Sequence, residues 1–246
     1  MTPWTKQKLG EVCLQITDGK HGDCQNLTDS GYYFISSKDV FDGFVHYGNA
    51  RQITQEDFID THKRTKLEVG DVLITNSGTI GRMALIKQND KVEKTTFQKS
   101  VAILKPDKEK VDNIFLYYFL LSKYNQLVSL GGGAAQHNLL LGDLRKFEIT
   151  VPNRSVQQNI SSTISLYDDL IENNEKRIKV LEEMAQRLYT EWFIKFKFPG
   201  HEKIKMVDSG VEYGNIPEGW KVANLGEVTK IVRGCSYSTE EIDDYA

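Results

Sequence analysis

The sequence predicts a mixed α/β domain followed by a long α-helix that pairs with another helix as a coiled coil. Three observations support this prediction. Short runs rich in Val, Ile, Phe and Tyr alternate with turn residues over residues 1–152. A heptad pattern without Gly or Pro then extends from Ile164 to Trp192. Finally, WTKQKLGEV at 4–12 returns as WKVANLGEV at 220–228, at a constant offset (220 − 4 = 216).

Five segments of the first region are predicted to form strands. Each is of strand length, is rich in β-branched or aromatic residues and is bounded by Gly, Asn, Asp or Pro. The segments are 32–40, 70–78, 82–86, 97–106 and 144–152. Residues 113–130 are too many for one strand and are apolar on all sides, so they predict a buried helix that ends at Gly131.

The second region carries apolar residues in alternating steps of three and four, which is typical of a coiled-coil interface. We expect the helix to run from Val156 to Phe196, about 41 residues or roughly 60 Å at 1.5 Å per residue. So small a domain cannot cover a helix of this length, and the helix therefore needs a partner. Asn174 is either a tolerated polar residue or a device that fixes the register of the pair. The predicted interface positions are Ile164, Tyr167, Ile171, Asn174, Ile178, Leu181, Ala185, Leu188 and Trp192.

The chain is predicted to divide into three parts: the domain (1–152), the helix (153–199), and a linker with a truncated second copy of the domain (200–246). An offset of 216 residues is far longer than the roughly 20–50 residues of a solenoid repeat. The repeat thus indicates a domain plus a spacer, with the second copy cut short. A chance match, or a common pattern at the entry to a strand, is the other explanation.

Charge and composition limit the possible partners. The net charge of −3 argues at first against nucleic acid, but residues 1–152 hold 19 Lys and Arg against 18 Asp and Glu. The acidic excess lies in residues 201–246, with 5 basic against 9 acidic side chains. A nearly neutral domain permits a local basic face without demonstrating one.

Other sequence features bear on the compartment. No apolar run approaches the ~20 residues of a membrane span, and the N-terminus lacks the apolar core of a signal peptide. Cys13, Cys24 and Cys235 are odd in number and far apart, so they predict neither a disulfide framework nor a zinc site. We expect a cytoplasmic protein without a membrane partner.

Motifs that carry catalysis are absent from the sequence. It contains no GxGxxG, no GxxxxGK[ST] and no GxSxG, and its five histidines never have metal-ligand spacing. The carboxylates and lysines of 106–110 stand in a row, which is typical of a solvated loop. We therefore expect no catalytic residue, no metal site and no bound cofactor, which leaves binding as the function.

Three segments are candidates for contact with nucleic acid. Residues 77–82 (SGTIGR) follow a predicted strand, and their glycines would let a phosphate approach the backbone, although the segment taken alone favours a simple hairpin turn. Residues 62–66 (HKRTK) are a compact basic cluster, and 131–138 (GGGAAQHN) end in amide and imidazole groups suited to base edges. The candidate residues are Lys63, Arg64, Ser77, Thr79, Arg82, Gln136, His137 and Asn138.

Together these segments resemble the specificity subunit of type I restriction-modification enzymes. GDVLITNSGTIGRMALI is similar to a signature segment of its target recognition domain, and GGGAAQHNLLLGDLRKFEITVP to the segment that closes that domain. VQQNISSTISLYDDLIENNEKRIKVLEEMAQRLYTEWF resembles its spacer helix. GNIPEGWKVANLGEV resembles the entry to the next recognition domain. The order of these segments is more specific than any one of them.

The resemblance implies a non-catalytic DNA-binding subunit. In that family two recognition domains, each reading half of a split DNA site, alternate with two long helices that pack antiparallel. Modification subunits transfer methyl groups from S-adenosylmethionine, and restriction subunits use ATP and Mg to translocate and cleave DNA. This chain departs from the pattern because it has one domain and one helix. The partner helix is therefore expected from an identical chain or from another specificity subunit.

Other classes of function remain alternatives. The chain could be a coiled-coil scaffold whose α/β domain binds a protein partner. Salt dependence separates the two hypotheses, since binding through several phosphates weakens steeply with salt and an apolar protein contact does not. An independent nuclease or methyltransferase is disfavoured by the missing motifs.

Overall fold

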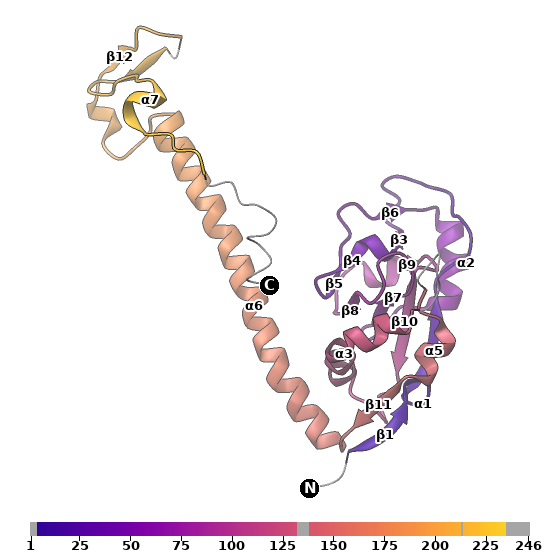
Figure 1. Ribbon diagram of the computed structural model, residues 1–246. Helices are drawn as coiled ribbons and strands as arrows, with labels where there is room; N and C mark the ends of the chain where they lie inside the picture. Colours follow the sequence, from indigo (N-terminus) through magenta and orange to yellow (C-terminus); the bar gives the residue numbers. More distant parts are fainter. Residues whose placement is uncertain (1–3, 132–137, 213, 235–246) are drawn as a thin grey trace. The chain divides into compact units, whose positions relative to one another are not determined.

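The N-terminal part of the chain is built around a four-stranded antiparallel sheet with the strand order β2-β10-β7-β8 (Figure 1). These strands are β2 (Cys13–Asp18), β10 (Val101–Pro106), β7 (Val72–Thr75) and β8 (Met83–Leu85). The computed structural model describes residues 4–131, 138–212 and 214–234. It forms two compact units, Met1–Leu170 and Ile171–Ala246. The three-part division expected from the sequence stays a prediction.

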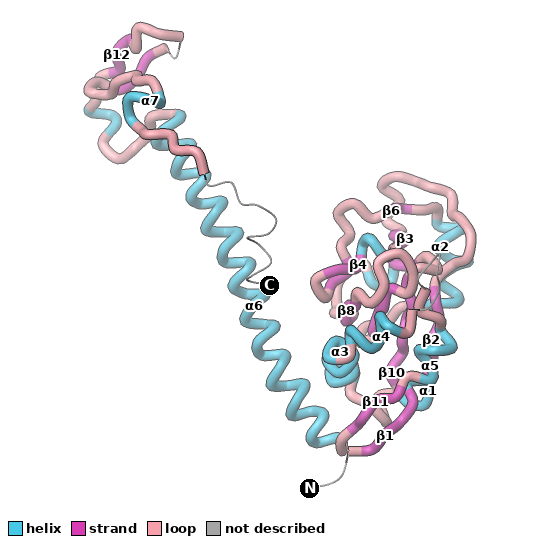
Figure 2. Tube along the Cα trace, in the orientation of Figure 1, coloured by secondary structure: helices cyan, strands magenta, loops and turns pink. Residues whose placement is uncertain are grey.

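Smaller sheets surround this centre (Figure 2). β3 (Tyr33–Ile35) lies between β6 (Arg51–Gln52) and β9 (Thr95–Phe97), and its pairing with β9 is parallel. β4 (Val40–Phe41) and β5 (Phe44–Val45) form a hairpin. β1 (Thr5–Lys8) pairs antiparallel with β11 (Glu148–Val151), which joins the two ends of the domain.

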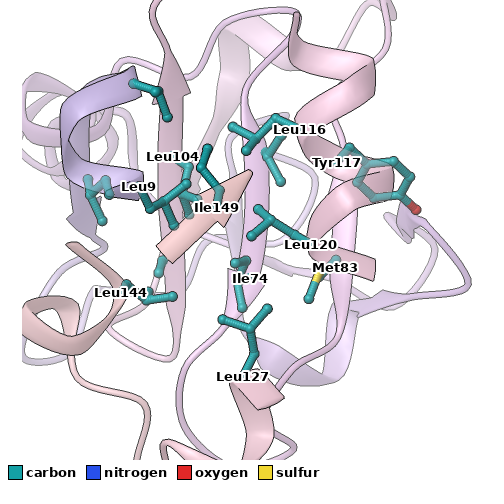
Figure 3. Packing of buried hydrophobic residues seen from close by; sticks show 14 of the residues in the cluster. Leu9, Ile74, Met83, Leu104, Leu116, Tyr117, Leu120, Leu127, Leu144 and Ile149 are labelled. Atoms are coloured by element: carbon teal, nitrogen blue, oxygen red, sulfur yellow. The ribbon is translucent and has the colours of Figure 1, made fainter. Parts of the chain in front are cut away.

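Both faces of the central sheet are covered, which explains why β7 and β10 are apolar almost throughout. Successive residues of a strand point to opposite faces. Ile74 and Leu104 belong to a cluster with α3 (Asn113–Ser122), shown in Figure 3, whereas Leu73 and Ile103 belong to a second cluster with Phe97. The remaining helices of this unit are α1 (Leu9–Val12), α2 (Gln55–Thr65), α4 (Tyr124–Ser129) and α5 (Leu141–Lys146).

The mixed α/β domain agrees with the prediction, but four segments differ in detail. The expected strand 32–40 is interrupted by a 3-10 turn over Ser37–Asp39, which separates β3 from β4. The expected strand 97–106 is two strands, β9 and β10, joined by a turn in which Val101 N donates to Gln98 O at 3.1 Å. The expected helix 113–130 is broken at Lys123, whose backbone (φ −105°, ψ 15°) leaves the helical region, giving α3 and α4. The expected strand 144–152 begins as α5 and becomes β11 only at Glu148.

The long helix is present. α6 (Arg154–Tyr189) has 36 residues, and a π-helical turn over Thr190–Ile194 adds 5, so the helical span is 36 + 5 = 41 residues. It starts and ends two residues earlier than predicted. No helix among the described residues is long and apolar enough to cross a membrane.

The C-terminal unit contains a hairpin of β12 (Met206–Asp208) and β13 (Asn215–Pro217), followed by α7 (Leu225–Val228). Trp220 packs on the rings of Phe193, Phe196 and Phe198, with centroids 6.2, 5.3 and 6.0 Å away. The repeated tetrapeptide LGEV forms a short helix in both of its copies, α1 and α7.

Candidate nucleic-acid interface and helix surface

Several loops meet at one edge of the central sheet. β2 and β7 end there, at Asp18 and Thr75, while the antiparallel strands β10 and β8 begin there. β3 and β9, which are parallel, end beside them. We call this surface the loop edge and define it as residues 19–22, 36–38, 76–82, 98–100 and 138.

Hydrogen bonds connect these loops into one surface. Lys20 N donates to Phe97 O at 2.8 Å, and Lys99 N donates to Lys20 O at 3.1 Å. On the other side of the β9–β10 turn, Asn76 N donates to Ser100 O at 3.0 Å, and Ser37 N donates to Ser100 Oγ at 3.1 Å. The turn at 98–100 therefore holds its neighbours in place, so the loop edge presents a fixed arrangement of side chains.

The predicted segment 77–82 forms the tight turn between β7 and β8. Thr75 secures it, because its hydroxyl donates to Thr79 O and accepts from Arg82 N at 2.9 Å. Gly81 has φ +86°, and a Cβ there would lie 2.9 Å from the Tyr124 ring. This glycine is therefore explained by the fold. The turn still leaves Thr79 exposed and Ser77 half-buried at the loop edge.

Asn138 is placed beside this turn. Residues 77 and 138 form an isolated antiparallel bridge, and Leu139 N donates to Asn76 O at 2.8 Å. The structure thus brings together the candidates Ser77, Thr79, Arg82 and Asn138 at the loop edge. Gln136 and His137 lie outside the described residues.

The basic candidates on α2 are placed differently. The Arg64 guanidinium pairs with the buried carboxylate of Asp18 and also donates to Thr17 Oγ1 at 3.3 Å. Asp18 also contacts His21 Nε2 at 3.0 Å. Lys63 lies on the outer face of α2 in an open depression lined also by the carboxylates Glu56, Asp57 and Asp60. In this arrangement Arg64 has an ionic partner and Lys63 lies among acidic side chains, and contact of either residue with DNA stays a prediction.

Two basic residues that the sequence analysis missed, Lys38 and Lys99, lie at the loop edge together with the predicted Arg82. Lys38 and Arg82 line one open depression of about 600 Å³, together with Phe41 and Tyr124. Lys99 is exposed next to Ser100, within the turn that was taken for part of a strand. Among the described residues no carboxylate pairs with Lys38, Arg82 or Lys99.

Lys20 differs from these three cations because it is paired. Its ammonium lies 3.0 Å from Asp57 Oδ1 and 3.3 Å from Asp60 Oδ2. The hydrogen bond to Asp57 raises the pKa of Lys20. The pKa of Asp57 is lowered, first by the Gln25 backbone N–H and then by Lys20. Both groups are therefore charged at neutral pH, and Lys20 ties the loop edge to α2.

A metal site is not formed by the described residues, in which no group of three or more His, Cys, Asp or Glu side chains could hold an ion. Cys13 is also unsuited to chemistry, because burial raises the pKa of its thiol to about 12. The loop edge offers cations, hydroxyl groups and amides. Such groups bind phosphates and base edges.

The predicted coiled-coil positions lie along α6 and its continuation, and most are exposed. Tyr167, Ile171, Ile178 and Leu181 are 66%, 57%, 55% and 61% exposed, although each is a large apolar side chain. Asn174, Ala185, Leu188 and Trp192 are exposed as well, while Ile164 is half-buried. A second row of exposed apolar residues runs beside the first, namely Leu166, Leu170, Val180, Met184 and Ile194. The apolar surface is thus wider than the contact strip of a two-helix pair.

Comparison with known proteins identifies the family of this fold. Residues 1–183 match the family model described as Type I restriction modification DNA specificity domain. This match covers more than half of the chain, so the chain belongs to the type I restriction-modification DNA specificity family. The resemblance inferred from its sequence segments is thereby confirmed.

Individual relatives agree with this assignment. The MjaIX specificity subunit of Methanocaldococcus jannaschii is 32% identical over 176 residues, covering 70% of this chain and 39% of the relative. The putative MjaX specificity subunit of the same organism is 26% identical over 244 residues, covering 95% of this chain and 55% of the relative. The chain thus spans about half the length of the relatives that it matches.

A solved structure supports the fold. The S subunit of a type I restriction-modification system from M. genitalium superimposes with a TM-score of 0.60 at 17% identity, over 85% of this chain and 55% of that chain. At this identity the similarity concerns the fold alone. It confirms the mixed α/β domain followed by the long helix.

Proposed function

We propose that this chain is a DNA recognition subunit of a type I restriction-modification complex and that its loop edge contacts one half of a split target. The observation that carries the proposal is a group of cations, Lys38, Arg82 and Lys99, that have no ionic partner among the described residues and lie around the exposed turn at Ser77 and Thr79. Cations position a duplex through its phosphates, and hydroxyl and amide groups read base edges. Asn138 contributes a side-chain amide beside this turn, because it forms the isolated bridge with Ser77.

Contact through loops fits the domain better than contact through an inserted helix. Phe115, Leu116 and Leu120 of α3 are buried in the core, so α3 cannot enter a groove. The outer face of α2 carries Glu56 and Asp60 beside Lys63, and acidic side chains repel phosphates. The loop edge, by contrast, is exposed and carries Lys38, Arg82 and Lys99.

The chain is proposed to be non-catalytic and to direct other subunits. Modification subunits would bring S-adenosylmethionine, and restriction subunits would bring ATP and Mg, so this chain would need no cofactor of its own. The second apolar row on α6 provides a surface for such subunits in addition to the predicted coiled-coil positions. The complex would act on DNA in the cytoplasm.

We further propose that two chains pair through α6 as an antiparallel homodimer. The distribution of charged residues along α6 supports antiparallel pairing. Residues 164–175 contain four acidic residues (Asp168, Asp169, Glu172, Glu175) and no Lys or Arg. Residues 176–197 contain six basic residues (Lys176, Arg177, Lys179, Arg187, Lys195, Lys197) against three Glu. Antiparallel pairing sets the acidic half of one helix against the basic half of the other, whereas parallel pairing sets like charges together. Pairing with a different specificity subunit is the alternative.

The function is tested at the loop edge with matched substitutions. Methylation-site sequencing in cells that carry the system first supplies the target duplex. Duplex binding is then measured for the chain together with modification subunits over a range of salt concentrations. We expect Arg82→Ala and Lys99→Ala each to weaken binding to all duplexes and to lower the salt slope by about 1, since each removes one phosphate contact.

Lys108→Ala is the control for this experiment. Lys108 is exposed like Lys99 but follows the opposite end of β10, so it removes the same charge from the far edge of the sheet. Its duplex affinity and salt slope should equal those of the unsubstituted chain. Equal effects at Lys108 and Lys99, or no effect at Arg82 and Lys99, would remove the loop edge as the DNA contact.

A further inference from the structure

The repeated segment 220–228 has the sequence and backbone of 4–12 but lacks its contacts. Lys8 (φ −85°, ψ 145°) and Asn224 (φ −72°, ψ 145°) lead into the helices α1 and α7 with nearly the same geometry. Leu9 and Val12 of α1 are 0% exposed. The equivalent Leu225 and Val228 of α7 are 65% and 70% exposed. The second copy therefore has a formed helix whose apolar side chains lack a partner surface among the described residues.

The surroundings of Gly10 in the first LGEV indicate the kind of surface that α7 lacks. A Cβ on Gly10 would lie 3.1 Å from Arg145 O and 3.2 Å from Arg145 Cβ, because α1 packs closely on α5. A Cβ on the equivalent Gly226 would meet no atom within 4 Å. Glycine at 226 is unexplained in the C-terminal unit, but it is explained if α7 also packs on an α5 helix.

The surface that holds 4–12 consists of α5, β11 and residues 107–110, and it binds mainly backbone atoms of that segment. Leu9 N donates to Phe147 O at 2.8 Å, Val12 O accepts from Asp107 N at 2.8 Å, and Glu11 O accepts from Lys110 Nζ at 2.9 Å. Any sequence can form such bonds. Leu9 fills the core beside Leu144 and Ile149 (Figure 3). The side chains that this surface selects, Leu, Gly and Val, are identical in the second copy.

The residues that differ between the copies make few side-chain contacts with this surface. Thr5 Oγ1 donates to Val151 O at 3.2 Å, and Lys6 Nζ lies 3.8 Å from Glu148 Oε2. Thr5, Lys6 and Lys8 of β1 are exposed, and their counterparts are Lys221, Val222 and Asn224. The capping glutamate is kept as well. Glu11 Oε2 accepts from Lys8 N at 2.8 Å, and Glu227 Oε1 accepts from Asn224 Nδ2 at 3.0 Å.

We propose that residues 220–228 bind the α5–β11 surface of a second copy of the chain, in exchange with that copy's own residues 4–12. The proposal rests on the antiparallel homodimer described above, in which the end of one α6 lies beside the start of the other. α6 begins at Arg154, directly after β11 ends at Val151. The hairpin β12–β13 folds the intervening residues back, and Trp220 packs on Phe193, Phe196 and Phe198. The second copy therefore starts beside the end of α6, which antiparallel pairing sets beside the start of the other α6.

Cross-linking in the full-length chain tests this exchange. Lys8 lies opposite Glu148 in the β1–β11 pair, and Asn224 is the counterpart of Lys8. Chains with Cys13, Cys24 and Cys235 replaced by Ser carry either Glu148→Cys (recipient) or Asn224→Cys (donor), and are mixed under mild oxidation. We expect an inter-chain disulfide between recipient and donor. A chain that carries both Lys8→Cys and Glu148→Cys forms a disulfide within itself while its own residues 4–12 occupy the surface. This disulfide therefore measures how much of the surface the resident segment occupies.

The same substitution in the two copies should act in opposite directions. Leu225→Ala in the donor removes an apolar contact from the incoming segment and should reduce the inter-chain disulfide at least fivefold. Leu9→Ala in the recipient weakens the resident segment and should raise the disulfide at least threefold. Circular dichroism of each variant confirms that the chains remain folded.

Each outcome decides between occupants of the surface. A dimer, measured by sedimentation, that forms no 148–224 disulfide overturns the exchange and leaves the homodimer intact. A monomeric chain overturns both proposals. A disulfide formed only within a chain that carries both Glu148→Cys and Asn224→Cys identifies the chain's own domain as the partner of the second copy and overturns exchange between chains.

Discussion

At the scale of single residues, Gly19 determines how the loop edge is assembled. A Cβ at this position would lie 1.9 Å from Phe97 O and 2.5 Å from Gln98 O, and both are backbone atoms that cannot turn aside. The loop at 19–22 can therefore approach the β9–β10 turn only because residue 19 has no side chain. The position of Lys20 and its hydrogen bond to Phe97 depend on this approach.

We expect Gly19→Ala to lower the free energy of unfolding by about 3 kcal/mol or more, since the backbone must shift to accept the methyl group. Gly48→Ala is the control, because a Cβ on Gly48 meets no atom within 4 Å. It should change stability by less than about 0.5 kcal/mol. Urea denaturation of both variants provides the measurement, and equal stabilities would contradict the close approach of the two loops.

Site residues could be predicted only where their signal is local. Gly78 and Gly81 flag the turn that presents Thr79 and Arg82, and this turn does lie at the loop edge. Arg64 was predicted as a phosphate contact from the basic cluster HKRTK, which could not reveal its ion pair with Asp18, 46 residues away in the sequence. Its contact with DNA stays a prediction. Lys99 was missed because FQKSVAILKP alternates like a single strand, and only the pairing of β10 with β2 and β7 shows where the turn falls.

At the scale of elements, a small buried network fixes the start of α6 to the domain. Gln157 and Ser161 are 2% and 4% exposed. Gln157 Oε1 accepts from Asp112 N at 2.8 Å, and Gln157 Nε2 donates to Pro152 O at 2.9 Å. Ser161 Oγ donates to Asp112 Oδ1, the same oxygen that caps α3 by accepting from Ile114 N and Phe115 N. The Asp112 carboxylate therefore caps α3 and also binds a side chain of α6.

We expect Gln157→Ala to cost about 2 kcal/mol or more, because it leaves a buried N–H and a buried C=O without partners. The free energy of opening derived from amide hydrogen exchange at the start of α6 should fall by the same amount. Gln158→Ala, on the exposed side of the same turn, removes an equal volume and should leave both stability and exchange unchanged. Equal exchange rates in the two variants would show that the network does not hold the helix.

Elements with a strong internal pattern were predictable, and those defined by their neighbours were not. α6 follows from heptads alone. By contrast, Leu144 and Phe147 fit a strand pattern, yet residues 141–146 form α5 because Leu144 is buried against α1 and β2. The break at Lys123 likewise lies inside an apolar run and carries no Gly or Pro signal.

At the scale of the whole molecule, the exposed row on α6 implies that the functional unit holds more than one helix. Leaving each large apolar side chain in water forfeits roughly 1.5–3 kcal/mol, which strongly favours a partner along the row. Under the proposed antiparallel pairing, a two-fold axis near Ile178 holds identical domains at opposite ends. Identical domains related by a two-fold axis bind inverted half-sites, so the target should be palindromic with an unread centre.

The length of α6 should then set the length of that centre. Duplication of residues 175–181 adds one heptad, which preserves the apolar row and lengthens each helix by roughly 10 Å, or about three base pairs of duplex. Methylation-site sequencing should show unchanged half-sites separated by a longer gap, or no methylation if the altered rotation between half-sites prevents binding. Insertion of two residues at the same place is the control, since at about 100° per residue it turns the following half of the row to the opposite side of the helix and should abolish dimerisation as well. An asymmetric target, or a chain that stays monomeric at micromolar concentration with its helix intact, would contradict the homodimer and favour a different specificity subunit as the partner of α6.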